Sequence, residues 1–524
     1  MNVLLDRWIH ILRRSGRSEY IAPWEITDSF GEDPVERLLV PRPDMLAALR
    51  EFLIGLFQTF LPPQKESEWK KVFENPPTPE ELCDLFKKKS YAFELLGDGP
   101  RFLQDPSVKD VSSKGIASLL IDEPGAKTAE DNLDFFVLSG QIQSIGLPGV
   151  IMALVSLQTY APAGGAGIRT SLRGGGPLTT LVIPGQSLGD SMHCSLWHKI
   201  WVNILPQKDF YRLVPGNREK NEDASIFPWL GKVRVSGPEG VDTTPQDMHP
   251  LHVFWGMPRR IYLDAPENSE AVCGVTGEKG SVITTYRTQK YGINYTGPWK
   301  HPLSPYRFDN EGRPIPLHPG VDGFAYRHWL ALALGDPANT EPAEIVKYAG
   351  TRRAKFDFEL SAFGYDMDNM KARGWHEGTV PFYNLENIDE NDFRDEVKNF
   401  LEAAEQIARN LRQTVLKAWF GNQTKGKSAR GVEASFWAET ETDFYAHLDK
   451  LYAALKESRN MVFVAHAWHK ALNRKAMELF ERWVVSGRFE YEDPGRSARA
   501  RRELLKFNHS KKIKSFLKLD QQGE

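Results

Sequence analysis

Two glycine clusters with arginines between them are the residues of this sequence with the clearest chemical meaning. They lie in Ala161–Thr180, which reads APAGGAGIRTSLRGGGPLTT, and the arginines are Arg169 and Arg173. Glycine lacks a Cβ atom, so its backbone can adopt positive φ and let another molecule come close. Guanidinium donors beside exposed amide groups suit the backbone of a polyanion. A glycine-rich turn inside a large fold is the alternative interpretation.

The glycine stretch differs from the phosphate-binding motifs of nucleotide-binding proteins. No Gly-Lys-Ser/Thr follows the glycines, and no clean G-x-G-x-x-G opens a helix there. The pattern therefore gives no support to a nucleotide hydrolase or a dinucleotide-binding enzyme.

Further basic residues are scattered along the chain. Arg287 and Lys290 lie in TTYRTQKYG, and Arg352, Arg353 and Lys355 lie in AGTRRAKF. The C-terminal stretch RSARARRELLKFNHSKKIKSFLK is also basic. Each of these charges taken alone is typical of a solvated surface, so a nucleic-acid site requires the fold to bring several together.

One motif of an enzyme class matches. Residues 185–189 read Gly-Gln-Ser-Leu-Gly, the nucleophile elbow of hydrolases with Ser187 as nucleophile, after a predicted strand. The chain lacks the regular alternation of strands and helices of an α/β-hydrolase, and no acid and histidine partners stand out. A strand-to-helix turn is the favoured interpretation.

Histidine and cysteine offer incomplete metal sites. His193, Cys194 and His198 lie in MHCSLWH, and His466 and His469 lie in HAWH. A closed zinc site needs four ligands, and a di-metal bundle needs Glu-x-x-His motifs on two helices. Cys273 lies in AVCGVTG, where Thr276 stands at the place of the second cysteine of a zinc knuckle. We therefore expect no metal and no cofactor.

The composition is that of a globular protein. The chain has 524 residues, 41% hydrophobic and 26% charged, with a formal net charge of -3. Any nucleic-acid site must therefore be a local patch on a nearly neutral body. Three distant cysteines argue against a disulfide framework and fit a reducing cytoplasm. We expect no signal peptide and no membrane-spanning segment.

Periodicity predicts the elements that carry these residues. Apolar residues recur at helical spacing over 41–60, and Thr78 with Glu81 forms a capping box. We expect a loop over 121–132, a buried strand over 133–140, a buried helix over 149–157 and a strand over 178–184. Residues 205–320 are rich in Pro, Gly, Trp and Tyr and indicate a β-rich, loop-heavy region with little helix.

The composition changes near residues 380–391, after which long helices with few breaks follow. Apolar stripes predict helices at 393–418, 437–455, 464–483 and 496–517. Four antiparallel helices joined by short loops would bury these stripes in a bundle. The predicted fold class is α+β, with a large mixed globular N-terminal domain over 1–378 and an all-α four-helix bundle over 379–519.

The sequence resembles the CasA family, the large subunits of Cascade, the type I-E CRISPR surveillance complex. The resemblance runs nearly end to end and rests on specific segments: MNVLLDRWI, NPPTPEELCDLF, SLRGGGPLTT, LHVFWGMPRRIYL, GPWKHPLSP and KGKSARGVEASFWAETETDFY. It implies a mixed α/β domain followed by a four-helix bundle, without catalytic activity. It also implies recognition of the protospacer-adjacent motif (PAM) in double-stranded target DNA, opening of the duplex for guide pairing, and recruitment of the helicase–nuclease.

The resemblance also implies which residues act. The family's glycine loop, which reads the motif mainly from the minor groove, falls on Ala163, Gly164, Gly165, Ala166 and Gly167. Arg169 is expected to bind the DNA motif together with this loop. Ala166 stands where relatives often have glycine, so the preferred motif could differ. The family's lysine finger aligns with Lys290, with Arg287 as the alternative.

Two further elements follow from the same resemblance. The family's wedge falls on TRRAKF, where Lys355 or Arg353 takes the place of a glutamine. The loop Asp122–Leu133, with Asn132, corresponds to the loop that docks on the guide RNA 5′ handle and a neighbouring Cascade subunit. The alternatives are a metal-dependent nuclease, a serine hydrolase, and a scaffold that binds only protein.

Overall fold

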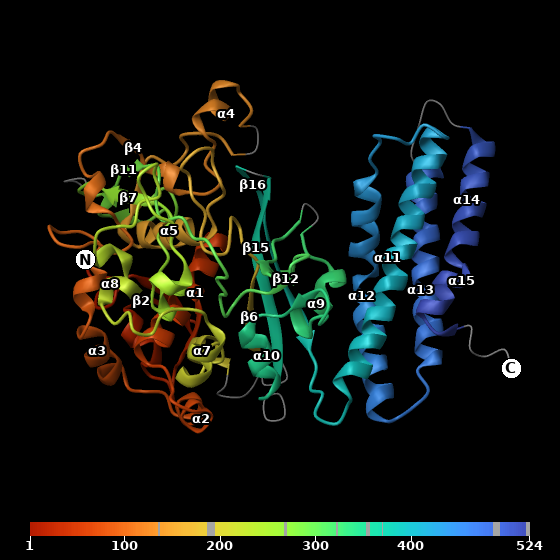
Figure 1. Ribbon diagram of the computed structural model, residues 1–524, viewed down its shortest axis with the longest axis horizontal. Helices are drawn as coiled ribbons and strands as arrows, with labels where there is room; N and C mark the ends of the chain where they lie inside the picture. Colours follow the sequence, from red (N-terminus) through yellow and green to blue (C-terminus); the bar gives the residue numbers. More distant parts are fainter. Residues whose placement is uncertain are drawn as a thin grey trace. The chain divides into compact units, whose positions relative to one another are not determined.

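A computed structural model describes residues 1–134, 137–185, 194–266, 270–320, 323–352, 357–368, 370–485 and 493–519. The chain forms two compact units, shown in Figure 1. Unit 1 comprises Met1–Gly323 and Pro337–Phe382, and unit 2 comprises Phe324–Asp336 and Tyr383–Glu524. The predicted domain boundary between 378 and 379 falls inside a strand of unit 1, four residues before the division.

Helix α1 (Pro43–Phe60) lies at the centre of unit 1 and confirms the helix predicted there. Apolar residues cover most of its circumference, and its proline at the first turn removes no internal hydrogen bond. The segment that contains Phe254 packs closely against this helix, because a Cβ atom on Gly55 would lie 2.8 Å from Cβ of Phe254. Helix α5 (Leu147–Tyr160), also predicted, packs along α1.

Aromatic side chains from distant segments fill the core beside α1. Phe102 and Trp229 meet edge to face with ring centroids 5.3 Å apart, and Phe93 and Trp255 meet likewise at 5.6 Å. Such pairs contribute about 0.5–1.5 kcal/mol each beyond the area they bury. Unit 1 is therefore held together by contacts of long sequence separation.

The other helices of unit 1 are short. They are α2 (Glu66–Glu74), α3 (Pro79–Lys87), α4 (Ala126–Glu130), α6 (Leu196–Trp201), α7 (Gln207–Leu213), α8 (Asp223–Ile226) and α10 (Glu344–Gly350). The predicted capping box is confirmed, because the Thr78 hydroxyl accepts from the Glu81 amide and the Glu81 carboxylate from the Thr78 amide.

Strands of unit 1 form several small antiparallel sheets, in the orders β2-β1-β3, β4-β11-β7, β13-β12-β14, β16-β15-β6, β10-β5 and β8-β9. The strands outside the sheet β16-β15-β6 are β1 (Ile9–Arg13), β2 (Ser18–Ile21), β3 (Val35–Leu38), β4 (Ser113–Gly115), β5 (Ile145–Gly146), β7 (Arg260–Leu263), β8 (Ala271–Val272), β9 (Lys279–Gly280), β10 (Val282–Ile283), β11 (Thr285–Gln289), β12 (Tyr306–Phe308), β13 (Pro314–Pro316) and β14 (Thr340–Glu341). The expected β-rich region 205–320 thus holds short strands, but also α7, α8 and several 3-10 turns.

The longest strands form the sheet β16-β15-β6. Strand β6 (Thr179–Pro184) was predicted, whereas the hairpin of β15 (Phe358–Asp368) and β16 (Lys371–Phe382) was not. Strand β15 is central, and its pairing with β6 runs from Phe358 opposite Pro184 to Phe363 opposite Thr179. This register fixes where the two ends of β6 lie.

The segment 133–140 differs from its prediction. Leu133 and Leu138 each keep 54% of their surface exposed, and the described residues of the segment form no strand, so the prediction of a buried strand is wrong. The preceding loop contains the one-turn helix α4, which projects from the rest of unit 1 (Figure 1). The apolar run had indicated burial, but its described residues Leu133, Val137 and Leu138 are exposed.

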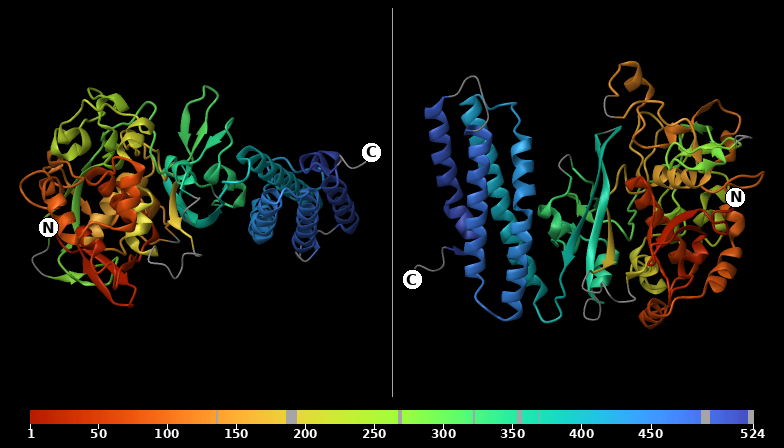
Figure 2. Two further views of the ribbon diagram at one scale, coloured as in Figure 1. Left: turned by 90° about the horizontal axis from the view of Figure 1, so that it is seen from below. Right: turned by 180° about the vertical axis from the view of Figure 1, so that it is seen from behind.

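Unit 2 is the predicted helical bundle. Helices α11 (Glu390–Phe420), α12 (Arg430–Lys456), α13 (Val462–Phe480) and α14 (Pro494–Asn508) run alternately up and down (Figure 2). The predicted fourth helix over 496–517 is two helices, because α14 ends at Asn508 and α15 (Lys511–Phe516) begins after the cap Ser510.

A polar layer sets the alignment of three bundle helices. The amide of Asn508 is fully buried, accepts from Asn410 at 3.1 Å and donates to Asn473 at 3.2 Å. His469 Nε2 lies 2.7 Å from the Asn508 carbonyl oxygen. Buried polar groups must be matched to their partners, so this layer disfavours a shifted register.

The segment Phe324–Asp336, which contains α9 (Trp329–Ala333), belongs to the bundle although it precedes it in sequence. Tyr326 stacks on Phe444 with centroids 4.3 Å apart, and its hydroxyl lies 2.9 Å from Thr440 Oγ1. The sequence-based boundary had placed this segment in the N-terminal domain.

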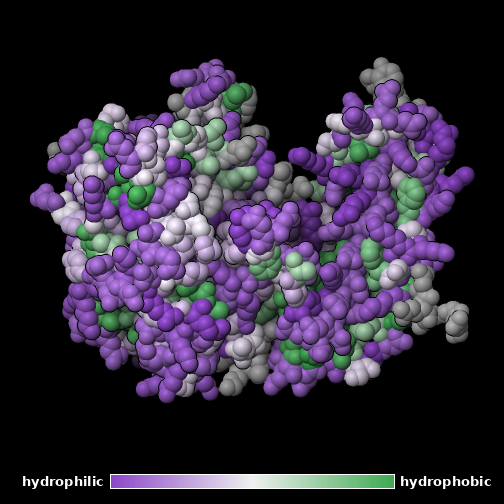
Figure 3. Space-filling view, viewed as in Figure 1, coloured by the Kyte–Doolittle hydropathy of each residue, from purple (hydrophilic) through white to green (hydrophobic). Residues whose placement is uncertain are grey.

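The visible surface of each unit is mainly hydrophilic, with apolar residues in small separate groups (Figure 3). None of the helices in the described part of the chain combines the length and apolarity needed to cross a lipid bilayer.

Candidate nucleic-acid interface

The first glycine cluster forms an exposed loop after α5. Gly165 and Gly167 have φ of 58° and 80°, which side chains other than glycine rarely adopt. Ala163, Gly165 and Ala166 are exposed, whereas Gly167 is buried. The loop therefore presents backbone and two methyl groups to its surroundings, and it is anchored at Gly167.

The anchor is the turn that carries Lys290. The Tyr291 amide donates to the Gly167 carbonyl at 2.7 Å. A Cβ atom on Gly167 would lie 2.8 Å from the Tyr291 ring and 3.1 Å from Lys290 Cβ, so only glycine fits. Tyr291 itself has φ of 66°, an uncommon conformation held by this contact. The fold thus brings the glycine loop and Lys290 side by side.

A third segment, Val235–Gly237, completes the arrangement. The Ser236 amide donates to the Tyr291 carbonyl at 3.2 Å, and the Ser236 hydroxyl donates to the Gly292 carbonyl at 2.7 Å. Arg169 Nε donates to Ser236 Oγ at 2.9 Å, and its Nη2 donates to the Ser236 carbonyl at 3.2 Å. We call these segments (Ala163–Arg169, Val235–Gly237 and Lys290–Gly292) the three-loop junction.

Two candidate cations, Arg287 in β11 and Lys290 directly after it, differ in what they contact. Arg287 pairs with Asp264 at 2.7 Å and donates to the Val111 carbonyl at 2.9 Å. Lys290 is exposed, and its ammonium makes no hydrogen bond or ion pair with the residues that the structure describes. Of these two candidates, Lys290 is the one whose charge is available to a ligand.

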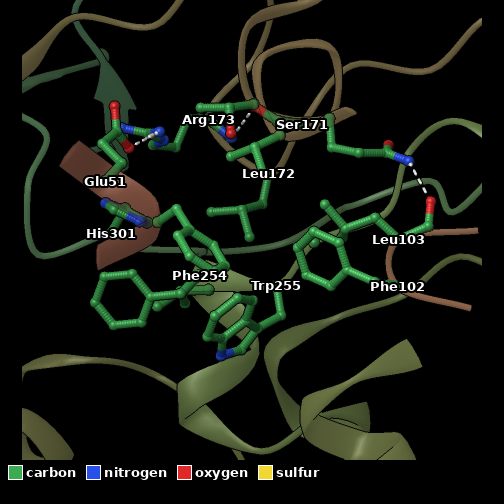
Figure 4. Close-up of a pocket in the computed structure, with 15 residues that line it drawn as sticks. Glu51, Phe102, Leu103, Ser171, Leu172, Arg173, Phe254, Trp255 and His301 are labelled. Carbon is green, nitrogen blue, oxygen red and sulfur yellow. Dashed lines mark hydrogen bonds and ion pairs between the residues drawn. The ribbon is translucent and has the colours of Figure 1, made fainter. Parts of the chain in front are cut away.

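Arg173 has a structural role. Only 3% of it is exposed, and its guanidinium pairs with Glu51 of α1 at 2.5 Å while donating to Thr179 and Ser304. Both residues of this pair, labelled in Figure 4, line a small cavity of about 40 Å³ together with Ser171 and Leu172. The expectation that Arg173 offers its charge to a polyanion is therefore wrong: the charge is already neutralised inside unit 1.

The second glycine cluster is closely packed as well. The Gly176 amide donates to the Tyr160 carbonyl at 2.8 Å, and a Cβ atom on Gly176 would lie 2.6 Å from the Tyr365 carbonyl oxygen. A Cβ atom on Gly175 would lie 3.1 Å from Cα of Pro162. These glycines let the chain pass between α5 and β15, which supports the root of the first loop.

Arg352, the first basic residue of the wedge segment, is also structural. Its guanidinium donates twice to the Glu66 carboxylate, at 2.9 and 3.0 Å, and lies 3.5 Å from the centroid of the Trp69 ring. Only 4% of Arg352 is exposed, so its inclusion among the candidate ligand-binding cations is wrong.

Arg353 and Lys355 lie outside the described residues. The first described residue after them, Asp357, accepts through its carbonyl oxygen from the Gly185 amide at the end of β6. Gly176 lies near the other end of that strand, against Tyr365 of β15. Five residue steps of about 3.4 Å separate the Pro184–Phe358 pair from the Thr179–Phe363 pair, or about 17 Å. The root of the wedge segment is thus a strand length away from the second glycine cluster.

Asn132 ends helix α4 in the left-handed conformation, with φ of 51°. The Leu133 amide donates to the Thr128 carbonyl at 2.9 Å and the Asn132 amide to the Ala129 carbonyl at 3.1 Å, the two bonds of a Schellman cap. Asparagine tolerates this conformation better than most residues. The side chain of Asn132 is exposed beside the apolar Leu133.

Residues proposed for other chemistries have structural contacts. His198 is buried, lies 2.8 Å from Ser195 Oγ through Nδ1, and packs against Phe73. Cys273 Sγ accepts from the Thr276 amide at 3.4 Å. Within the described ranges, no three His, Cys, Asp or Glu side chains are grouped to hold a metal ion. Ser187 and His193 lie outside those ranges.

Ser236 and Tyr291 escaped the sequence analysis. Ser236 stands in a Ser-Gly-Pro turn signal and Tyr291 before a glycine, but neither signal names a partner. Their roles depend on a contact with the glycine loop, which no local pattern shows.

The sequence model of CRISPR-associated protein Cse1 matches residues 2–479. The chain belongs to the Cse1 family. Among solved structures, Thermus thermophilus CasA (Cse1) has 17% identity and a TM-score of 0.67, covering 97% of this chain and 99% of that one.

Two further structures have the same fold. Thermobifida fusca Cse1 has 14% identity and a TM-score of 0.69, covering 100% of this chain and 99% of its own. A chain of a CRISPR RNA-guided surveillance complex has 16% identity and a TM-score of 0.69, covering 97% and 99%. The resemblance to this family and the α+β fold with a helical bundle are confirmed. At these identities the likeness shows the Cse1 fold, while the roles of single side chains rest on local geometry.

Proposed function

We propose that this Cse1 chain is the large subunit of a type I-E CRISPR surveillance complex and reads the PAM in duplex DNA with the three-loop junction. Membership of the family supports the first part, together with solved relatives described as parts of CRISPR RNA-guided surveillance complexes. The second part rests on the junction itself.

The observation that carries the proposal is the contact between Gly167 and Tyr291. It places a ribbon without large side chains beside the exposed ammonium of Lys290. The minor groove of B-DNA is about 6 Å wide and presents mainly acceptors, the purine N3 and pyrimidine O2 atoms. Backbone amides around Gly165 and Ala166 could donate to these acceptors, and Lys290 could donate to a base or a phosphate. Arg169 holds the loops in place.

Opening of the duplex is a further part of the proposed role. Lys355 or Arg353 would insert beside the motif and separate the first base pair. Unstacking costs about a few kcal/mol per step, and contacts of the junction with the motif would offset that cost. A long cation could occupy the gap and contact a phosphate.

The remaining parts of the role involve partners. The α4 loop with Asn132 would dock on the guide RNA 5′ handle and a neighbouring Cascade subunit, and the bundle would recruit the helicase–nuclease. In this role, in the cytoplasm, the chain positions nucleic acid and catalyses no reaction itself.

The test is DNA binding by the assembled complex with Lys290→Ala. Lys88, exposed after α3, provides the matched control Lys88→Ala. We expect Lys290→Ala to weaken binding to a duplex with the motif, and to lower the slope of log affinity against log salt by about 1 if the ammonium contacts a phosphate. Equal affinities of the two variants would favour the scaffold that binds only protein.

A further inference from the structure

A second feature of unit 1 is a cavity of about 410 Å³ on one face of the sheet β16-β15-β6. Ser361 of β15 pairs with Leu181 of β6 and Thr379 of β16, so these three residues form one row across its floor. The walls come from α1, α6 and β3, and they are mainly apolar. The residues that line the walls include Leu38, Leu46, Leu196 and Ile200.

Three cations from three elements line this cavity: Arg37 of β3, Arg50 of α1 and Lys199 of α6. Glu377 is the one carboxylate among the described lining residues, which leaves an excess of two positive charges. The Arg50 guanidinium has no hydrogen bond or ion pair to any described residue, and the Lys199 ammonium donates to the Glu36 carbonyl at 3.1 Å.

The electrostatic balance of the site is unfavourable without a ligand. Burial lowers the pKa of Arg50, and the Glu377 carboxylate only partly opposes this. Burial also lowers the pKa of Lys199, and the positive charges of Arg50 and Arg37 lower it further. Both side chains are half-buried, and partial desolvation of a cation is offset best by a nearby anion.

We propose that this cavity binds a small organic phosphate of about the size of a mononucleotide. Arg50 and Lys199 would hold the phosphate, since a guanidinium fork matches two phosphate oxygens and an ammonium adds a point charge. The apolar part of the ligand would lie against Leu46, Leu181 and Ile183. The volume lies in the range of about 300–1,000 Å³ typical of small-molecule sites.

Two sources could supply this chemistry, a free nucleotide or a nucleotide of a DNA single strand. The experiment therefore measures binding of the purified full chain to inorganic phosphate, to dAMP and to a short oligothymidine. Thermal stabilisation and calorimetry serve as readouts. The variants are Arg50→Gln and Lys199→Gln, and the matched control is Lys208→Gln, an exposed lysine of α7 outside the cavity.

We expect Arg50→Gln to weaken binding at least about tenfold, as the loss of a charge-assisted pair does, and Lys208→Gln to leave it unchanged. Binding of dAMP would assign the site to free nucleotides, and binding of oligothymidine alone to a strand. No binding of either at millimolar concentration, or binding that is equal in Arg50→Gln and the wild type, overturns the proposal.

Glu377→Gln gives an independent measurement that does not depend on removing a half-buried cation. Because the carboxylate repels an anion, its neutralisation should tighten binding, the opposite direction to Arg50→Gln. Weaker or unchanged binding in Glu377→Gln would contradict an anion in this cavity. The DNA affinity of Lys290→Ala is a separate readout, so failure here leaves the three-loop junction untouched.

Discussion

The amide of Tyr291 donates to the carbonyl of Gly167 at 2.7 Å, and this bond joins two segments more than a hundred residues apart in sequence. It fixes the anchor of the glycine loop and the start of the turn that carries Lys290. The proposed DNA contact is thus a property of a tertiary junction and not of a single loop.

A first prediction concerns the glycine at this anchor. Gly167→Ala would force an L residue to φ of 80° and place its methyl group 2.8 Å from the Tyr291 ring. We expect the free energy of unfolding to fall by about 2–4 kcal/mol, from backbone strain and overpacking together. DNA affinity of the assembled complex should fall as well, because Lys290 would be displaced.

Gly165→Ala is the control for this substitution. Its φ of 58° is also unfavourable for alanine, but no atom lies within 4 Å of the added Cβ. Denaturant unfolding should show a loss of about 1–2 kcal/mol, the strain alone. If both variants lose the same stability, the packing of Gly167 on Tyr291 is not what matters.

A second prediction separates the roles of Arg169 and Lys290. Arg169 donates to Ser236 and so acts on the shape of the junction, whereas Lys290 would contact DNA. Arg169→Ala should lower DNA affinity with little change in its salt dependence, while Lys290→Ala changes both. Binding isotherms over a salt series check this, and a smaller salt slope in Arg169→Ala would show that Arg169 contacts a phosphate itself.

A third prediction concerns the buried pair of Arg173 and Glu51. Arg173→Met leaves the Glu51 carboxylate buried without its cation, and we expect a loss of about 3–5 kcal/mol in stability. Arg173→Met with Glu51→Leu should lose less, because no lone charge remains. Unfolding followed by tryptophan fluorescence measures both. A double variant less stable than Arg173→Met would refute this account.

A fourth prediction is a pH dependence of stability. Burial lowers the pKa of His252 to about 4 from an ordinary value near 6.5, and its ring nitrogens contact the Ile226 carbonyl and the Tyr295 hydroxyl. The unfolded chain therefore binds the proton more readily, so this contribution to stability is present above pH 6.5 and lost as pH falls toward 4.

The contribution of His252 between pH 7 and pH 5 should be about 2 kcal/mol. His252→Gln should remove that part of the pH dependence while lowering stability at neutral pH. Unfolding curves of wild type and variant at both values measure the difference, and parallel pH profiles would mean that His252 does not titrate as described.

A fifth prediction tests the proposed wedge. Lys355→Ala should reduce strand opening, measured by the reactivity of unpaired thymines, more than it reduces capture of the duplex. Lys290→Ala should reduce both together, because it acts on recognition of the motif. Equal effects of Lys355→Ala on the two measurements would exclude a wedge at that residue.

The elements with strong periodicity could be predicted from the sequence. Helix α1, the cap at Thr78 and the bundle helices each carry a local pattern of apolar or capping residues. The hairpin β15–β16 could not be predicted, because β16 is an edge strand whose residues are mostly exposed or half-buried and show no apolar alternation. Its place depends on pairing with β15.

The candidate site was predictable only in part. The glycine loop and Lys290 could be named, but Arg169 and Arg173 look alike in sequence. Their acceptors, Ser236 and Glu51, lie 67 and 122 residues away in sequence. No local pattern therefore shows that Arg169 links two loops whereas the charge of Arg173 is neutralised by a carboxylate. Tertiary contacts decide which charges remain available.

The way Gly167 is anchored has a consequence for engineering. Exchanging residues 163–167 between homologues as a cassette would leave the transplanted loop on a foreign Tyr291 and Ser236. A chimera meant to acquire another motif preference must therefore carry residues 235–237 and 290–292 along with the loop, so the smallest transferable module is discontinuous in sequence.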